Sequence, residues 1–200
     1  MVVIQKYKVG ITGGIGSGKS TVCRIFELLG LPVYYSDLRA KELIHTNEKI
    51  IAMYKRLFGE AIYISGQLNR PRVAKILFDN PQLKKEVEEM VHPMVRNDFD
   101  QWARHQTSNI VLNEAAILFE SGGHQFMDAI ITITAPESIR IKRVVKRDGF
   151  AEPEIRARMN HQWSDEMKCA LSHYVIECDD KQLVIPQVLE IYNILDQLKR

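Results

Sequence analysis

The residues with the clearest chemical meaning form one continuous stretch near the start of the chain. It reads Gly13-Gly14-Ile15-Gly16-Ser17-Gly18-Lys19-Ser20 and fits the pattern G-x-x-x-x-G-K-[ST]. Glycines let the backbone wrap closely around phosphate oxygens, and a helix that starts behind them directs its free N–H groups at the same anion. The sequence therefore predicts a nucleoside triphosphate site, with Lys19 at the β- and γ-phosphates and the Ser20 hydroxyl on Mg²⁺.

The flanks of this stretch supply the setting that the pattern requires. Residues 8–12 before it are suited to a buried strand, and residues 21–29 after it carry apolar side chains at helical spacing. A glycine-rich turn without any ligand is the alternative, and the strand and helix on either side argue against it. The pattern indicates a nucleotide but leaves the subsequent chemistry open.

Asp37 is the first candidate for that chemistry. It follows a predicted strand, Val33-Tyr34-Tyr35, and precedes a predicted helix at 38–45. A carboxylate facing the γ-phosphate can accept the proton of an acceptor hydroxyl. The strand of residues 33–35 is expected to end beside the first strand, so that the adjacent strand ends place Asp37 and the phosphate loop in one crevice. The alternative is that Ser36 or Asp37 caps the helix that follows.

Further candidates are one glutamate, three arginines and one histidine between residues 92 and 147. Glu114 ends a predicted strand at 109–114 and is expected either to organise Mg²⁺ through water or to pair with a cation. Arg140, Arg143 and Arg147 recur at helical spacing, so they either stabilise a transferring phosphoryl group or form a solvated face. His92, which precedes Pro93, is expected from the sequence alone to be a structural turn residue.

Composition bounds the class of protein. The chain has 200 residues, 46% of them hydrophobic, which suits one large domain or a domain with an inserted lobe. Its net charge of +2 argues against nucleic acid or a membrane surface as the main partner. The three cysteines, Cys23, Cys169 and Cys178, have no disulfide or zinc spacing. Without a signal peptide or a membrane-length apolar run, the expected location is the cytoplasm.

The order of predicted elements indicates an α/β fold with a parallel sheet flanked by helices. Residues 47–106 are expected to be a helical insert, with helices that start at Pro71, Pro81 and Pro93. Strands are expected again at 109–114, 129–134 and 174–178, and helices at 136–147, 153–170 and 185–198.

The chain resembles the dephospho-CoA kinases over nearly its whole length. The resemblance is carried by residues 10–21, by Asp37 with Ala40 and Lys41 behind it, and by several shorter pieces that follow in the family's order. These pieces are His92-Pro93, Ile117-Leu118-Phe119-Glu120, Arg140 with Lys142-Arg143, Arg147-Asp148, Arg158 with Gln162, and Val175-Ile176.

The resemblance implies that ATP phosphorylates the ribose 3′-hydroxyl of dephospho-CoA, giving CoA and ADP. It implies a P-loop NTPase-like core (1–46, 107–135 and 172–200), a CoA-binding lobe (47–106) and a lid (136–171). ATP binding is expected at residues 13–21, from Gly13 to Thr21. Asp37, Lys19, Arg140 and Arg143 are the expected catalytic residues, and Thr12, Asp37, Lys41, His92 and Glu114 are expected to bind substrate.

Four residues depart from the family's pattern. Tyr35 stands where Asp is common, Lys41 where Arg is usual, Ala116 where Pro is usual, and Cys178 where Asn is common. A lysine offers a point charge in place of a bidentate grip on phosphate, and the Cys178 departure puts an adenine contact at that position in doubt. Two other classes stay open: a kinase for a nucleoside or shikimate-like acceptor, and a nucleotide-dependent binding module. The long helical insert favours a bulky acceptor.

Overall fold

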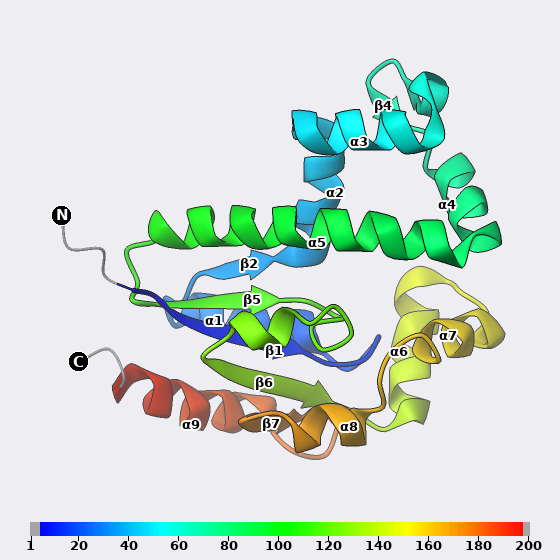
Figure 1. The fold of residues 1–200 in the computed structure, drawn as a ribbon. Coiled ribbons are helices and arrows are strands. Elements are labelled where there is room, and N and C mark those ends of the chain that lie inside the picture. The colour runs from blue at the N-terminus through cyan, green and yellow to red at the C-terminus, as the bar shows by residue number, and fades with distance from the viewer. Residues whose placement is uncertain (1–4, 198–200) are drawn as a thin grey trace. The chain divides into compact units, whose positions relative to one another are not determined.

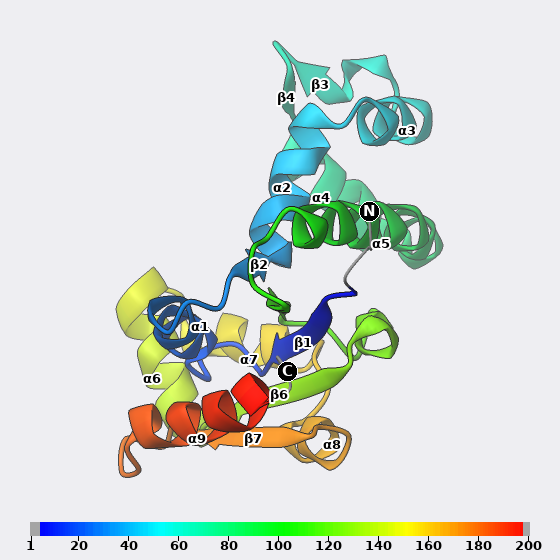
Figure 2. The same ribbon diagram turned by 90° about the vertical axis from the view of Figure 1, so that its left-hand side faces the viewer.

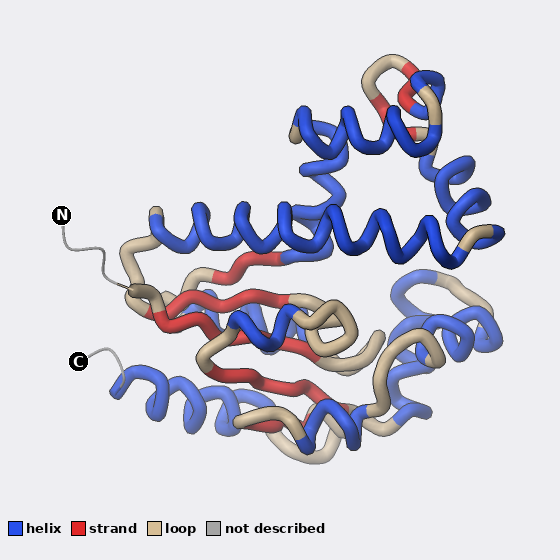
Figure 3. The backbone as a smooth tube through the Cα atoms, viewed as in Figure 1, coloured by secondary structure: helices blue, strands red, loops and turns tan. Residues whose placement is uncertain are grey.

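The structure is a computed structural model that describes residues 5–197. Within that range the chain divides into two compact units. The first combines the residues up to Tyr35 with those from Trp102 onward, and the second is Ser36–Gln101. The first unit contains a five-stranded sheet, whereas the second is made of helices and one short hairpin (Figure 3). The helical lobe expected from the sequence, residues 47–106, overlaps most of this second unit but begins and ends later in the chain.

The sheet of the first unit is parallel throughout, with strand order β2-β5-β1-β6-β7 (Figure 1). Its central strands are nearly continuous apolar runs, as expected for strands that are covered on both faces. This confirms the predicted α/β class with a parallel sheet flanked by helices. The strands are β1 (Tyr7–Thr12), β2 (Val33–Tyr35), β5 (Ile110–Glu114), β6 (Ala129–Thr134) and β7 (Tyr174–Glu177).

The expectation that β1 and β2 are neighbours is wrong. Strand β5 lies between them, since Asn113 of β5 is in register with Gly10 of β1 on one side and with Tyr34 of β2 on the other. The ends of β1 and β2 are therefore two strand spacings apart, about 10 Å. Strand order is a long-range property that local patterns do not carry. One consequence is that Glu114, the last residue of β5, ends the strand between them.

Helices cover both faces of this sheet. Helices α1 (Lys19–Leu28) and α9 (Val184–Gln197) lie together on one face, and α8 (Asp165–Ala170) lies on the other (Figure 2). The larger core forms under α1 and α9. On the opposite face, Leu118 and Phe119 pack with Ile130, beside a short 3-10 turn, η2 (Gly123–Phe126). Members of the larger core include Val9, Ile11, Phe26, Ile131, Ile133, Val188 and Leu195.

Two further helices, α6 (Glu137–Asp148) and α7 (Glu152–Met159), follow β6 and share a small core of their own. Ile15, from the loop after β1, packs against this core. The single helix predicted for 153–170 is wrong, because residues 160–164 separate α7 from α8. Ser164 ends that interruption: its Oγ accepts a hydrogen bond of 3.3 Å from the Met167 amide and so caps α8.

The second unit is built from helices α2 (Ser36–Thr46), α3 (Glu48–Phe58) and α4 (Arg70–Asp79) and most of α5 (Pro81–Arg104). A 3-10 turn, η1 (Glu60–Ile62), and the hairpin of β3 (Tyr63–Ile64) and β4 (Gln67–Leu68) connect α3 to α4. The predicted helix start at Pro93 is wrong, because α5 continues through Pro93 and loses only one backbone hydrogen bond there. Among residues 5–197, no helix has the length and apolar character needed to span a membrane.

Candidate active site

The loop between β1 and α1 passes so close to its neighbours that only glycine fits at two positions. Gly13 has φ 148° and Gly16 has φ 78°, values that other residues rarely adopt. A Cβ on Gly13 would lie 2.2 Å from the carbonyl oxygen of Ile133, and a Cβ on Gly16 would lie 2.6 Å from that of Arg140. The glycines of the pattern therefore let the loop wind between β6 and α6 without collision.

Lys19, the first residue of α1, turns back over this loop. Its Nζ donates a hydrogen bond of 2.9 Å to the Gly13 carbonyl oxygen and lies 3.9 Å from Glu114 Oε1. The two charged side chains are only 12% and 11% exposed. The structure thus brings Lys19, Glu114 and the loop together at the carboxyl edge of the sheet, so a cation and an anion share one enclosed site.

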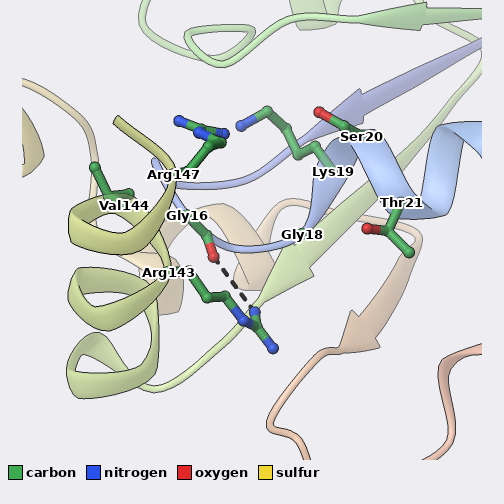
Figure 4. A pocket seen from close by; sticks show the side chains of 8 residues that line it. All are labelled: Gly16, Gly18, Lys19, Ser20, Thr21, Arg143, Val144 and Arg147. Carbon is green, nitrogen blue, oxygen red and sulfur yellow. Dashed lines mark hydrogen bonds between the residues drawn. The ribbon is translucent and has the colours of Figure 1, made fainter. Parts of the chain in front are cut away.

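A cavity of about 280 Å³ opens beside the loop (Figure 4). The side chains of Lys19 and Arg147 extend toward one another on one side of it. Ser20 and Thr21, in the first turn of α1, line it and are exposed. The lining residues are Gly16, Gly18, Lys19, Ser20, Thr21, Arg143, Val144 and Arg147.

The Ser17 hydroxyl of the loop is buried but has no hydrogen-bond partner among the described residues. A buried polar group without a partner costs free energy, on the order of 1–3 kcal/mol. The loop therefore contains one buried polar atom that the described part of the protein does not use.

The three arginines of α6 have different surroundings, which the sequence did not indicate. Arg143 joins separate segments: its guanidinium donates to the carbonyl oxygen of Gly16 at 3.3 Å (Figure 4). It also donates to the carbonyl oxygen of Cys178 at 2.8 Å and binds the Asp180 carboxylate. Arg147 pairs with the adjacent Asp148 at 2.8 Å, and its side chain is 61% exposed. The Arg147 guanidinium holds the pKa of the Asp148 carboxyl below its usual range.

Arg140 is the most enclosed of the three. Its side chain is 11% exposed, and Nη1 donates a hydrogen bond of 2.8 Å to Asp165 Oδ1. The guanidinium lies against Gly14 of the loop, where a Cβ would be 2.7–2.9 Å from its atoms. The interpretation of this helix as a uniformly solvated face is wrong at Arg140, which contacts the loop because Gly14 leaves room for it.

The α7–α8 connection holds contacts that the sequence reasoning missed. Gln162 Oε1 accepts a hydrogen bond of 2.9 Å from the Ile15 amide, so this connection binds the tip of the loop. Lys168 is fully buried in α8 and lies 3.0 Å from Glu120 Oε1. In the sequence, Asp165 and Lys168 look like surface positions of a polar helix, and no local signal marks either as buried or paired.

Comparison with known proteins agrees with this geometry. The family model of dephospho-CoA kinase matches residues 7–183. A dephospho-CoA kinase of Bacteroides fragilis is 39% identical over 191 residues, which cover 95% of this chain and 93% of that protein. The chain belongs to the dephospho-CoA kinase family.

Solved structures show the same fold. A crystal structure from Thermus thermophilus matches with a TM-score of 0.85 and 31% identity, covering 95% of this chain and 97% of that one. The dephospho-CoA kinase from Campylobacter jejuni matches with a TM-score of 0.71 and 22% identity, covering 98% of this chain and all of that one, 100%. The family model and the relative from Bacteroides fragilis confirm the dephospho-CoA kinase resemblance stated from the sequence, and the solved structures confirm the fold.

Three residues on which a dephospho-CoA kinase would be expected to rely lie in the second unit. Asp37 and Lys41 are exposed on α2, and Asp37 falls inside the first turn, so it is not the residue that caps the helix. His92 is half-buried in the middle of α5, not in a turn. Burial lowers the pKa of His92; Arg96 acts in the same direction and Glu88 opposes it.

The departures from the dephospho-CoA kinase pattern have local explanations in two cases. Ala116 and Cys178 act through their backbone: the Ala116 carbonyl oxygen accepts a hydrogen bond from Lys168 at 3.1 Å, and that of Cys178 accepts one from Arg143. Both contacts are independent of the side chain. Tyr35 ends β2, and its pKa is raised by burial and by the nearby Cys23 and Glu27.

Among residues 5–197 there is no group of three or more His, Cys, Asp or Glu side chains that could hold an ion. A kinase Mg²⁺ is usually bound by one or two protein oxygens, water and the phosphates of its nucleotide. The Ser20 hydroxyl and the Glu114 carboxylate are the oxygen donors beside the loop that suit this pattern.

Proposed function

We propose that this protein transfers the γ-phosphoryl group of ATP to the ribose 3′-hydroxyl of dephospho-CoA, giving CoA and ADP, the last step of CoA synthesis. The observation that carries the proposal is a complete phosphate-binding loop, between a central strand and its helix, in a chain of the dephospho-CoA kinase family. In the reaction the acceptor oxygen bonds to the γ-phosphorus, the bond to the β-phosphate oxygen breaks, and the acceptor proton leaves.

The loop from Gly13 to Thr21 would bind the phosphates of ATP. Backbone N–H groups at the start of α1, the unused Ser17 hydroxyl and the Lys19 ammonium are donors suited to phosphate oxygens. Ser20, and Glu114 through water, would hold Mg²⁺, which would supply positive charge to the phosphates when bound. When the nucleotide binds, Lys19 would exchange its contact with the Gly13 carbonyl for the phosphates.

The transfer step would use charge from Arg140 and Arg143 and a base at Asp37. Phosphoryl transfer depends mainly on positioning and on stabilising charge over the transferring oxygens, so enclosed guanidinium groups beside the loop are suited to it. Asp37 comes two residues after the end of β2, and the carboxyl ends of parallel strands are where α/β proteins bind ligands. Its carboxylate would accept the proton of the 3′-hydroxyl.

The acceptor would be held by Thr12 together with the helical part of the chain. We assign residues 47–106 as the CoA-binding lobe, with contributions from Lys41 on α2 and His92 on α5, and residues 136–171 as a lid over ATP. A neutral His92 imidazole, favoured by its lowered pKa, can both donate and accept hydrogen bonds. ATP and dephospho-CoA are the expected small-molecule partners. The cytoplasm is the expected location of the protein.

A panel of acceptors tests the proposal. ADP release would be followed in a coupled assay with Mg²⁺, ATP and either dephospho-CoA, adenosine or shikimate. We expect turnover with dephospho-CoA and only background ATP hydrolysis with the other two compounds. Faster turnover with adenosine or shikimate would assign the protein to another class of small-molecule kinase, and equal ADP release without any acceptor would indicate a nucleotide-dependent binding module.

A further inference from the structure

We propose that Asp165 is a positioning residue for phosphoryl transfer, which holds the Arg140 guanidinium against the phosphate loop before the nucleotide binds. The inference rests on the proposed function, in which Arg140 supplies charge to the transferring group. It concerns a residue that is outside every motif of the chain and that would not touch ATP itself.

The ion pair between the two side chains is enclosed enough to fix orientation. Arg140 Nη1 donates to Asp165 Oδ1 at 2.8 Å, with side-chain exposures of 11% and 19%. Charge-assisted hydrogen bonds of this kind are short and directional, and little water competes with this one. Gly14 lacks the Cβ that would collide with the guanidinium, so the loop and the arginine are fitted to each other.

The pair leaves part of the guanidinium unused. Arg140 Nε is buried and has no hydrogen-bond partner among residues 5–197. An arginine has five N–H donors, and the bond to Asp165 occupies a single one of them. Asp165 therefore anchors one end of the group, while other N–H donors of Arg140 have no partner among the described residues.

Asp165 is itself held in place from both sides. Just before it, the Trp163 amide donates a hydrogen bond of 2.8 Å to Glu120 Oε1. One helical turn after it, the fully buried Lys168 lies 3.0 Å from the same oxygen and donates to the Ala116 carbonyl oxygen at 3.1 Å. The Glu120 carboxylate thus fixes the start of α8. Asp165, at that start, is therefore held in place, and its hydrogen bond in turn fixes the Arg140 guanidinium.

An alternative role for Asp165, in which it keeps Arg140 away from the phosphate, makes a different prediction for kcat. If Asp165 sequesters Arg140 from the phosphate, removing the carboxylate should free the arginine and raise kcat. If Asp165 positions Arg140, removing it lets the guanidinium move among several orientations, and kcat falls because fewer molecules have the arginine in place.

The test is a double-mutant cycle in the full chain. Asp165→Ala and Asp165→Asn would be made in the natural sequence and in the Arg140→Ala background, with kcat and the KM for ATP measured using ATP and dephospho-CoA. Glu190→Gln is the control, because it removes a carboxylate from an exposed position of α9, on another helix of the same unit. Melting temperatures would show that each variant is folded.

We expect Asp165→Ala to lower kcat roughly 10-fold, as for loss of one charge-assisted hydrogen bond, and Asp165→Asn to lower it less. Neither should lower kcat further in the Arg140→Ala background, and Glu190→Gln should keep normal kcat. Equal losses in both backgrounds, an unchanged kcat or a raised kcat would overturn the positioning role. A normal kcat for Arg140→Ala alone would instead overturn the proposed function of Arg140.

Discussion

The candidate residues of the two units are held in different ways. In the first unit, Lys19, Glu114 and Arg140 have side chains that are only 11–12% exposed, and each contacts a charged partner. In the second unit, Asp37 and Lys41 are exposed on the surface of α2. In the first unit, the charged side chains of the candidate site are also packed among their neighbours. A substitution there should affect stability as well as rate, whereas one on α2 should affect rate almost alone.

Asp37→Asn should produce the largest and cleanest separation of rate from stability. A general base contributes roughly 10²–10⁴-fold, so we expect kcat to fall by about that factor. Loss of a charge from the first turn of α2 should cost only about 0.3–1 kcal/mol of unfolding free energy. Steady-state kinetics and urea unfolding measure both quantities.

The control for Asp37→Asn is Glu48→Gln, since Glu48 is exposed in the first turn of α3 in the same unit. It should lose a similar small amount of stability and keep normal turnover. Normal turnover for Asp37→Asn as well would remove Asp37 from the mechanism and leave it with a helix-dipole interaction only.

Lys19→Ala should affect both quantities. Removing one preorganised charge at the phosphates typically lowers kcat by about 10²–10³-fold. The change also takes a positive neighbour from the nearly buried Glu114, so the midpoint of urea unfolding should fall. Lys6→Ala is the control: its Nζ binds the carbonyl oxygens of Gln106 and Ser108, so its loss should lower stability without lowering kcat. A Lys19→Ala enzyme with kcat near normal at saturating ATP would contradict the phosphate role.

Lys168→Met should mainly reduce stability. The change leaves the Glu120 carboxylate beside a buried apolar side chain, and breaking a buried ion pair in this way costs about 3–5 kcal/mol. Adding Glu120→Gln should recover part of this loss, because a neutral amide can still accept from the Trp163 amide. Urea unfolding of the single and double variants measures the recovery. A double variant less stable than Lys168→Met would show that the pair is not the source of the loss.

The smallest expected effect is the pH dependence from His92. Burial lowers its pKa in the folded state below the unfolded value of about 6.5, so the unfolded chain takes up the proton first. The contribution of His92 is therefore fully present above pH 6.5 and is lost as the pH falls below it. His92→Gln should lose less melting temperature between pH 7.5 and 5.5 than the natural sequence does. Thermal unfolding of both proteins at the two pH values measures the difference. An identical pH response in His92→Gln would exclude this source.

Local patterns predicted the elements well but not their neighbours. The phosphate loop, its flanking strand and helix, and the parallel sheet follow from glycine spacing and apolar runs, which act over a few residues. The position of β5 between β1 and β2 does not, because it depends on pairing between residues about 80 to 100 positions apart. The helix through Pro93 was missed because tertiary packing can offset one lost hydrogen bond.

Residue types in the sequence pointed to some of the residues that gather at the loop, but residues whose contacts depend on burial were missed. Lys19 belongs to the phosphate-binding motif and Glu114 ends a strand, so both could be selected as candidates from the sequence. Lys168 and Asp165 lie in a short polar helix, and nothing in their sequence neighbours indicates that one is buried and the other binds Arg140. Burial of a charged side chain is decided by the elements on every side of it, which no short window contains.

The central place of β1 has a consequence for how the chain folds as it is synthesised. Strand β1 is synthesised before both of its partners, β5 and β6, so Gly10 cannot pair until Asn113 and Ile130 have been made. Contacts of such high sequence separation form slowly, since a long loop must close first. More than half of the chain must therefore be made before the phosphate loop has both of its supporting strands, and until then its apolar strand is exposed to chaperones and to aggregation.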